Sequence, residues 1–331
     1  MTSPYMVSRR YDWALFLGPP LASLAAGALF AVTSFGADTV WLEGRRQTHL
    51  DIGIGVLIHA HLVAVFFRSH ANPTIFKHHP ARFVVVPIAL VVAMLISEIA
   101  AVVVTVVATF WDVYHSALQT FGFARIYERN CGNDPSVMRK LDWALNQLLY
   151  VGPIVAGASM LAHFDKLSLL DPVDEVFFGA VPAFMETNQS YLAWAVLIAG
   201  ALFVAYYVYA SLRLRRAGHR ISPQKIWLLA STGLCSIVAW GFNPWGQAFV
   251  IMNLFHAVQY LGLVWFTEGR RVLKGARWFG LPLFVVIVVA YGLWAEFVPE
   301  SRRLPWAVVQ VVAIMHFWYD GFIWSVTKKQ I

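Results

Sequence analysis

Apolar residues along this chain fall into long runs, each separated from the next by a short polar segment. An α-helix needs about 20 mostly apolar residues to cross the roughly 30 Å hydrocarbon core of a membrane. Nine runs approach or exceed that length: residues 13–35, 51–67, 83–109, 141–163, 190–212, 226–242, 247–267, 278–298 and 305–325. The less apolar stretch 110–127 continues the helical pattern after the third run, and we interpret it as a short, partly buried span. The sequence therefore predicts an all-α bundle of about ten transmembrane helices.

Basic residues divide unevenly between the two sides of this arrangement. Short cytoplasmic loops of membrane proteins carry an excess of lysine and arginine. With the N-terminus in the cytoplasm, 20 of the 25 basic residues lie in inner loops and 5 in outer loops. Omitting the span at 110–127 inverts every later loop and removes the asymmetry. We therefore expect both termini to be cytoplasmic, with residues 1–331 forming a single integral domain of a bacterial inner membrane.

The composition agrees with a membrane protein and excludes several other classes. The chain is 59% hydrophobic and only 13% charged, against about 25% charged in an ordinary soluble domain. The net charge of +7 resides in short loops, which reflects topology and argues against a nucleic-acid partner. The absence of a glycine-rich phosphate-binding motif in the sequence argues against an ATP-driven pump. The two cysteines, Cys131 and Cys235, form no metal-binding motif.

Histidines recur at membrane depth on four spans that all run from outside to inside. They are His59 and His61 on the second span, His115 on the fourth, His256 on the eighth and His316 on the tenth. At 1.5 Å per residue, His59, His256 and His316 lie roughly 12–17 Å from the outer ends of their spans, and His115 about 7 Å. Ionisable residues at such depth are costly and mark functional sites. We expect these histidines to converge on one site.

Polar neighbours accompany the histidines on the same helix faces. A spacing of three or four residues places two side chains on one face. Three pairs follow this rule: Asp112 with His115, Gln259 with His256, and Asp320 with His316. A metal-bound imidazole requires such a partner, which either joins the ligand set or orients the ring. We assign Asp320 as a further ligand, and Asp112 and Gln259 as orienting or proton-transferring residues.

Two further assignments concern the second and third spans. Glu98 falls in the middle of the third apolar run, where an ionised carboxylate needs a partner, so we place it with Asp112 and Gln259 at the site. His59 and His61 are about 200° apart on a regular helix, so the two do not face the site together. We favour His59.

The donor set indicates the metal. Imidazole and carboxylate without thiolate suit iron, zinc, copper or manganese, and several histidines with one acid favour non-haem iron. Two histidines on facing helices could instead clamp a haem. A metal within the bilayer is well placed to act on a lipophilic substrate with O₂, because both partition into lipid. The sequence specifies neither the substrate nor an oligomeric state.

The motifs that surround these residues resemble those of a known group. They are W-D-x-x-H-x-x-x-Q-x-x-G at 111–122, F-H-x-x-Q-Y at 255–260 and H-x-x-x-D-G-x-x-W at 316–324. Their distribution over several spans resembles the histidine-rich membrane oxygenases, above all the Brp/Blh group of bacterial carotene-cleaving dioxygenases. The resemblance implies a single iron held by histidines from several spans, and a carotenoid as one candidate substrate. The histidine boxes of membrane fatty-acid desaturases are missing from the sequence.

The sequence therefore favours a membrane-embedded, histidine-ligated metalloenzyme, an iron oxygenase for a lipophilic substrate. Two other classes remain open at this point. One is a proton- or ion-coupled transporter that uses the same histidines, aspartates and glutamate as a relay. The other is a b-type haem protein.

Overall fold

The computed structural model describes residues 3–33, 38–42, 45–161, 175–243, 245–299 and 301–324. The outer loop around residue 166 and the C-terminal Lys328 and Lys329, which contributed to the charge asymmetry, lie outside these ranges. The chain forms two compact units. Unit 1 comprises residues 1–27 and 112–256, and unit 2 comprises residues 28–111 and 257–331. The boundaries between them fall inside three helices, so neither unit is one continuous stretch of chain.

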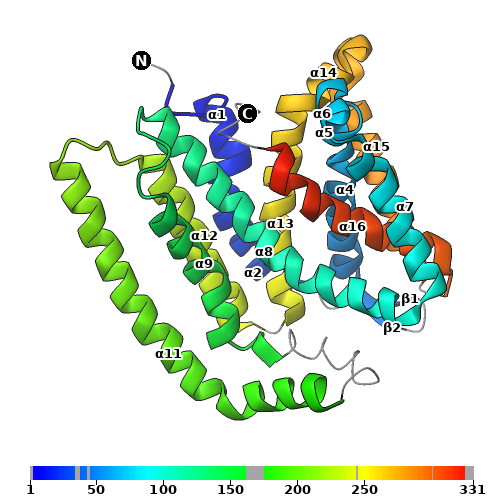
Figure 1. Ribbon diagram of the computed structural model, residues 1–331, viewed down its shortest axis with the longest axis horizontal. Coiled ribbons are helices and arrows are strands. Elements are labelled where there is room, and N and C mark those ends of the chain that lie inside the picture. The colour runs from blue at the N-terminus through cyan, green and yellow to red at the C-terminus, as the bar shows by residue number, and fades with distance from the viewer. Residues whose placement is uncertain are drawn as a thin grey trace. The chain divides into compact units, whose positions relative to one another are not determined.

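Unit 1 begins with α1 (Arg9–Asp12), a π-helical turn (Trp13–Leu17) and most of α2 (Pro19–Ala31), all drawn in blue in Figure 1. It continues with the second half of α8 (Glu98–Asn130), then α9 (Arg139–Ala156), α11 (Glu175–Arg216), α12 (Pro223–Phe242) and the first part of α13 (Trp245–Val264). Its core lies among α8, α9, α12 and α13. Buried residues there include Ala117, Tyr150, Ile154, Cys235, Trp240 and Met252.

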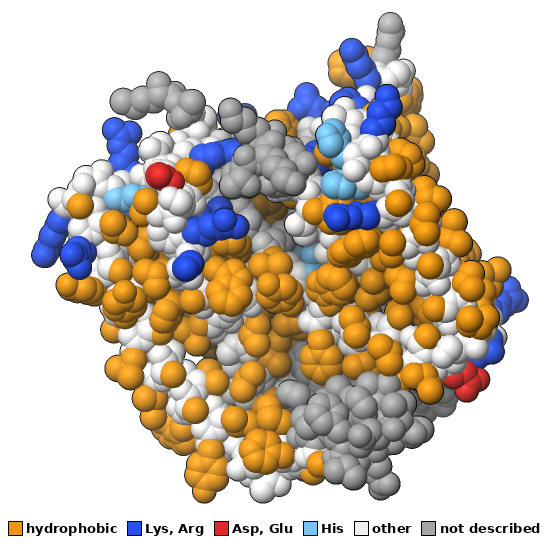
Figure 2. Space-filling view, in the orientation of Figure 1, with side chains coloured by type: hydrophobic (Ala, Val, Ile, Leu, Met, Phe, Trp, Pro, Cys, Tyr) orange, Lys and Arg blue, Asp and Glu red, His pale blue; other side chains and the backbone are white. Residues whose placement is uncertain are grey.

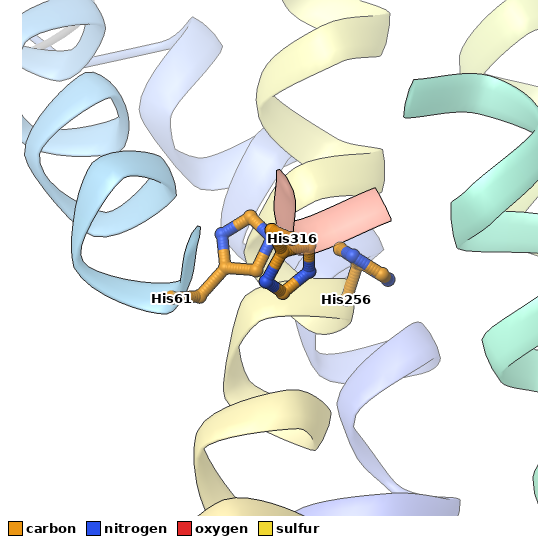
Figure 3. Close-up of side chains that lie close together, drawn as sticks. All are labelled: His61, His256 and His316. Atoms are coloured by element: carbon orange, nitrogen blue, oxygen red, sulfur yellow. The ribbon is translucent and has the colours of Figure 1, made fainter. Parts of the chain in front are cut away.

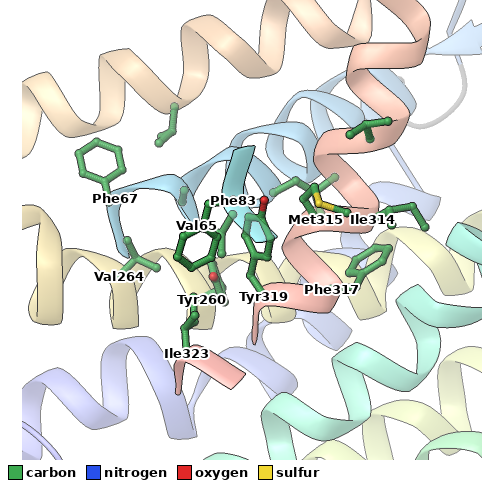
Figure 4. Close-up of a cluster of buried hydrophobic side chains, with 14 of the residues drawn as sticks. Val65, Phe67, Phe83, Tyr260, Val264, Ile314, Met315, Phe317, Tyr319 and Ile323 are labelled. Carbon is green, nitrogen blue, oxygen red and sulfur yellow. The ribbon is translucent and has the colours of Figure 1, made fainter. Parts of the chain in front are cut away.

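Unit 2 contains the only strands in the described part of the chain, β1 (Thr39–Leu42) and β2 (Arg45–Thr48), which pair antiparallel with Thr39 opposite Thr48. Helices α4 (His49–Ala64), α5 (Phe66–Ser69), α6 (Pro73–His78) and α7 (Pro80–Ile96) follow, and then the first half of α8. After α13 come a π-helical turn (Trp265–Gly269), α14 (Arg270–Val272), a 3₁₀ helix (Lys274–Phe279), α15 (Gly280–Glu296) and α16 (Arg303–Ile323). Figure 4 shows part of the core, to which Val65, Phe83, Tyr260, Phe317 and Tyr319 contribute.

The all-helical prediction agrees with the structure at the level of fold class. Six helical segments are long and apolar enough to cross a membrane. The number rises to seven if the bent pair Arg9–Leu17 and Pro19–Phe30 is counted as one span. Two shorter apolar helices, Pro80–Ile96 and Gly280–Glu296, are also present. Within the described residues, these counts support a protein with several transmembrane helices.

The division between the third and fourth predicted spans differs from expectation. We expected it near residue 110, but α8 runs unbroken from Glu98 to Asn130, and the chain breaks at Ser97 instead. Ser97 has extended backbone angles and its Oγ accepts a hydrogen bond from the Ala100 amide at 3.2 Å. A serine in this position caps the first turn of a helix, and a glutamate after it interacts favourably with the helix dipole.

Unit 1 buries a set of charged side chains near the ends of α8, α9 and α12. Arg125 binds Asp142, which also accepts a hydrogen bond of 2.6 Å from the Tyr207 hydroxyl. Lys225 Nζ lies 2.9 Å from Glu128 Oε2 and 3.4 Å from Asp142 Oδ1. Because burial of an unpaired charge is very costly, these contacts fix the helix ends relative to one another.

Helices α4 and α15 of unit 2 pack through glycine. A Cβ atom on Gly292 would lie 2.3 Å from the Val56 carbonyl oxygen and 3.2 Å from the Ala60 Cβ. Only a residue without a side chain permits this approach of the two backbones. We expect Gly292→Ala to lower the free energy of unfolding by about 1–3 kcal/mol, because α15 must move away from α4.

The matched control is Gly122→Ala on α8, where nothing lies within 4 Å of an added Cβ. This variant should keep its stability or gain roughly 0.5–1 kcal/mol, since alanine favours helix. Unfolding in mixed micelles, followed by circular dichroism, measures both changes. Equal stability of the two variants would contradict the close packing of α4 on α15.

Candidate metal centre

Two buried histidines of unit 2 face each other from different helices. His61 on α4 and His316 on α16 are both fully buried. Their ring centroids are 5.0 Å apart, and the ring planes are nearly perpendicular, at 85° (Figure 3). Each offers a ring nitrogen within 4.8 Å of the other's. At this separation two imidazoles are close enough to share one metal ion.

The backbone of α4 sets the orientation of the His316 ring. His316 Nδ1 lies 3.1 Å from the carbonyl oxygen of Leu62. A carbonyl oxygen only accepts, so Nδ1 carries the proton and donates it. The Nε2 atom of neutral His316 then presents its lone pair, and it lies 3.9 Å from Asp320 Oδ2. Imidazoles that bind metals are commonly held by such a bond from the other ring nitrogen.

Asp320 lies one helical turn after His316 and is held by two donors. Its Oδ1 accepts hydrogen bonds from the Tyr260 hydroxyl at 2.9 Å and from the Trp324 indole at 2.8 Å. The other oxygen, Oδ2, is the one nearest His316. The Tyr260 ring packs against both histidines, with its centroid 4.5 Å from His316 and 6.0 Å from His61. Tyr260 therefore holds the carboxylate and also forms an apolar wall beside the imidazoles.

A buried ion pair between Arg68 and Glu268 lies next to the Trp324 ring. The guanidinium carbon of Arg68 lies 4.0 Å from the Trp324 ring centroid, and Arg68 Nε donates to the Ile323 carbonyl at 2.9 Å. Arg68 Nη1 also binds Glu268 Oε1 at 2.6 Å. Glu268 belongs to the π-helical turn that follows α13, and such turns occur frequently at functional sites. The pair ties the ends of α5 and α16 to this turn.

Unit 1 contains a second histidine pair, His115 on α8 and His256 on α13. Their ring centroids are 5.2 Å apart with perpendicular planes, at 89°, and both side chains are buried. Gln119 Nε2 donates to the His256 carbonyl at 3.2 Å. Helix α13 continues past His256, the last residue of unit 1, and Tyr260 follows it by four residues on the same face. Figure 3 includes the His256 side chain.

On the second span, the structure brings His61 to the site where we had favoured His59. His59 Nε2 lies 3.7 Å from Glu296 Oε2 on α15. The face of α4 that carries Gly55 and His59 packs on α15. The His61 ring instead lies against His316 on α16. The choice between the two histidines depends on this packing, which the helical spacing alone did not specify.

The three residues expected to assist the metal have different positions. Gln259 is fully buried in α13, and Asp112 is half-buried one turn before His115. Glu98 is not with the histidines of unit 2: its side chain is 86% exposed and binds Arg303 at 3.1 Å. Because the chain breaks at Ser97, Glu98 begins a helix and does not lie in the middle of a span. Its assignment to the site is therefore corrected.

Buried histidines and a carboxylate placed in this way could hold a metal ion. Imidazole and carboxylate donors are compatible with iron, and equally with zinc, copper or manganese. Comparison with known proteins adds no relative: no family model, curated protein or solved structure matches this chain. The resemblance to the carotene-cleaving dioxygenases thus receives no support from these comparisons.

The buried ion pair between Arg68 and Glu268 leads to a prediction about stability. Glu268→Gln leaves the Arg68 charge buried beside a neutral amide, which we expect to cost about 3–5 kcal/mol of unfolding free energy. Arg271 also binds Glu268, at 2.6 Å, but its side chain is 47% exposed. Arg271→Gln should therefore cost about 1 kcal/mol or less. Unfolding of the two variants in mixed micelles tests the difference, and equal losses would show that burial does not strengthen the Arg68 contact.

Proposed function

We propose that this protein is a membrane-embedded metalloenzyme whose metal is held by histidine, and that it is a non-haem iron oxygenase for a lipophilic substrate. The observation that supports the proposal most strongly is the pair His61 and His316, with Asp320 beside it. The Leu62 carbonyl orients one imidazole, and Tyr260 and Trp324 orient the carboxylate. A set of donors oriented in this way before metal binding is typical of metal sites.

We propose His61, His316 and Asp320 as ligands. His256 and His115, which pair with each other in unit 1, remain candidate ligands from the sequence, and Asp112 and Gln259 remain candidate orienting residues. Bound iron would supply the activation of O₂. The residues of the chain would hold the ion, orient its ligands and exclude water.

The surroundings of the histidines support an apolar substrate. Aromatic side chains pack against them, with the Phe317 ring centroid 5.7 Å from that of His316 and the Trp111 ring 6.4 Å from that of Phe317. Pockets for small molecules are mostly apolar, with a few polar groups that fix orientation. A lipid-soluble substrate and O₂ would both reach such a site from the bilayer. The bacterial inner membrane is the location we propose.

A second candidate function, a proton- or ion-coupled transporter, is favoured by the buried charges of unit 1. Ionisable residues inside helical membrane proteins often line ion or proton pathways. The carboxylates of Glu128 and Asp142 are, however, bound to Lys225 and Arg125. Paired charges at helix ends are typical of structural ties, so the metalloenzyme is the better supported function.

Metal analysis of histidine variants tests the proposed function. Gently purified wild-type protein should contain about one iron per chain, without the visible absorption of haem. We expect His61→Ala and His316→Ala to lose nearly all of it, since each removes a ligand. The matched control, His59→Ala, should retain iron because His59 lies beside Glu296.

Elemental analysis and a visible spectrum of each variant provide the readout. Full iron in both His61→Ala and His316→Ala would overturn the ligand assignment. Loss of iron from His59→Ala alone would identify His59, our first choice on α4, as the metal ligand in place of His61. A wild type without any bound metal would leave the transporter as the better function, and a Soret band would identify a haem protein.

We also propose the full topology of ten spans with both ends in the cytoplasm, supported by the distribution of basic residues. Five of these spans separate Asp134 from Ser301, both of which are exposed. In a Cys131→Ser background, Ser301→Cys should react with a membrane-impermeant thiol reagent in intact cells. Asp134→Cys should react only after permeabilisation. The reverse pattern would invert the orientation, and reaction of both in intact cells would change the number of spans between them.

A further inference from the structure

A groove of about 730 Å³ opens on unit 1 between the start of α9 and the end of α11. Three basic residues line it: Arg139, Lys140 and Arg213. All three are exposed, and none of the described residues that line the groove is acidic. The volume is in the usual range for a small-molecule site. The groove is therefore a positively charged concavity without a counter-charge of its own.

The remaining walls of the groove are amphipathic. Tyr206 and Tyr209 are more than half exposed and line it together with Leu141, Ala210 and Leu214. Tyrosines with an apolar ring and a polar end are enriched where membrane meets water. Such walls would contact both the glycerol region and the first part of an acyl chain of a lipid.

The first turn of α9 adds partial positive charge to the groove. Met138, which precedes the helix, has the left-handed backbone angle φ of 60°, and no described side chain caps the helix. Helix N-termini bind anions through their amide groups and their dipole. The acidic residue in this turn, Asp142, is fully buried and bound to Arg125 and Tyr207. Its charge is thus neutralised inside the unit.

The setting of the groove indicates the source of the anion. Helix α11 forms a candidate membrane span of which only 11% of the most apolar window is buried, so lipid would cover most of its surface. Its last turn carries Arg213, Arg215 and Arg216. Figure 2 shows Lys and Arg side chains gathered at the upper left, above a broad hydrophobic surface. Basic pockets beside helix ends recognise the headgroups of anionic lipids.

We propose that this groove binds one anionic phospholipid, with its phosphate at Arg139, Lys140 and Arg213 and its glycerol region against Tyr206 and Tyr209. The site requires that unit 1 inserts in a membrane, and it does not depend on the metal centre. The lipid would add a further link between the end of α11 and the start of α9, which already meet through the hydrogen bond from Tyr207 to Asp142.

Native mass spectrometry of the delipidated full chain, titrated with phosphatidylglycerol, tests the proposal. Wild-type protein should bind one phosphatidylglycerol and should bind phosphatidylcholine with the same acyl chains at least about tenfold more weakly. The triple variant Arg139→Gln/Lys140→Gln/Arg213→Gln should lose affinity for phosphatidylglycerol on the order of 100-fold, since each basic residue contributes roughly fivefold. The matched control, Arg215→Gln/Arg216→Gln/Arg220→Gln, removes three nearby charges outside the groove and should bind as wild type.

Each other outcome overturns the proposal. Equal losses in the two triple variants would mean that general surface charge, and not the groove, attracts the lipid. Equal binding of the two lipids would exclude recognition of the anionic headgroup. Displacement of phosphatidylglycerol by equimolar inorganic phosphate would show that the groove takes a free anion. Circular dichroism of each variant verifies that the fold is retained.

Discussion

The cost of burying a charge away from water constrains both units of this protein. In unit 2 the Arg68 guanidinium is buried against Glu268, Trp324 and the Ile323 carbonyl. In unit 1 Arg125 and Lys225 are buried against Asp142 and Glu128. A buried ion pair adds a polar constraint to the apolar packing, because a shift of one helix would leave a charge buried without its partner. These pairs therefore help to fix the register of the helices within each unit, and in unit 2 Arg68 also packs on the Trp324 ring, whose indole donates to Asp320.

Much of the fold could be predicted from hydrophobicity, because long apolar runs have few alternatives to a helix. The division at Ser97 could not be predicted in this way, since apolar residues continue on both sides of it. A local rule does identify it: serine followed by glutamate is a common start of a helix. The difference bears on the candidate site, because Glu98 begins a helix, and its exposure and its contact with Arg303 do not support a role beside the histidines of unit 2.

Only those parts of the candidate site that depend on spacing along a single helix could be predicted from the sequence. The pair His316 and Asp320 follows from the spacing along one helix, and the structure places the two within 3.9 Å. The selection of His61 over His59 required the rotation of α4 about its axis. That rotation is set by the close approach to Gly292 of α15, which a single sequence does not reveal. Tyr260 entered the sequence analysis only as the last residue of the motif at 255–260, yet its hydroxyl holds the carboxylate.

The acceptor that orients His316 has a consequence for how this protein can vary. It is the main-chain oxygen of residue 62, which every amino acid possesses. Substitutions at that position therefore leave the acceptor in place as long as the helix keeps its path. The Leu62 side chain itself is buried in the apolar core of unit 2, so a substitution of similar size there changes the packing beside His316 without turning the imidazole. Selection can thus tune the neighbourhood of the histidine and the direction of its ring independently.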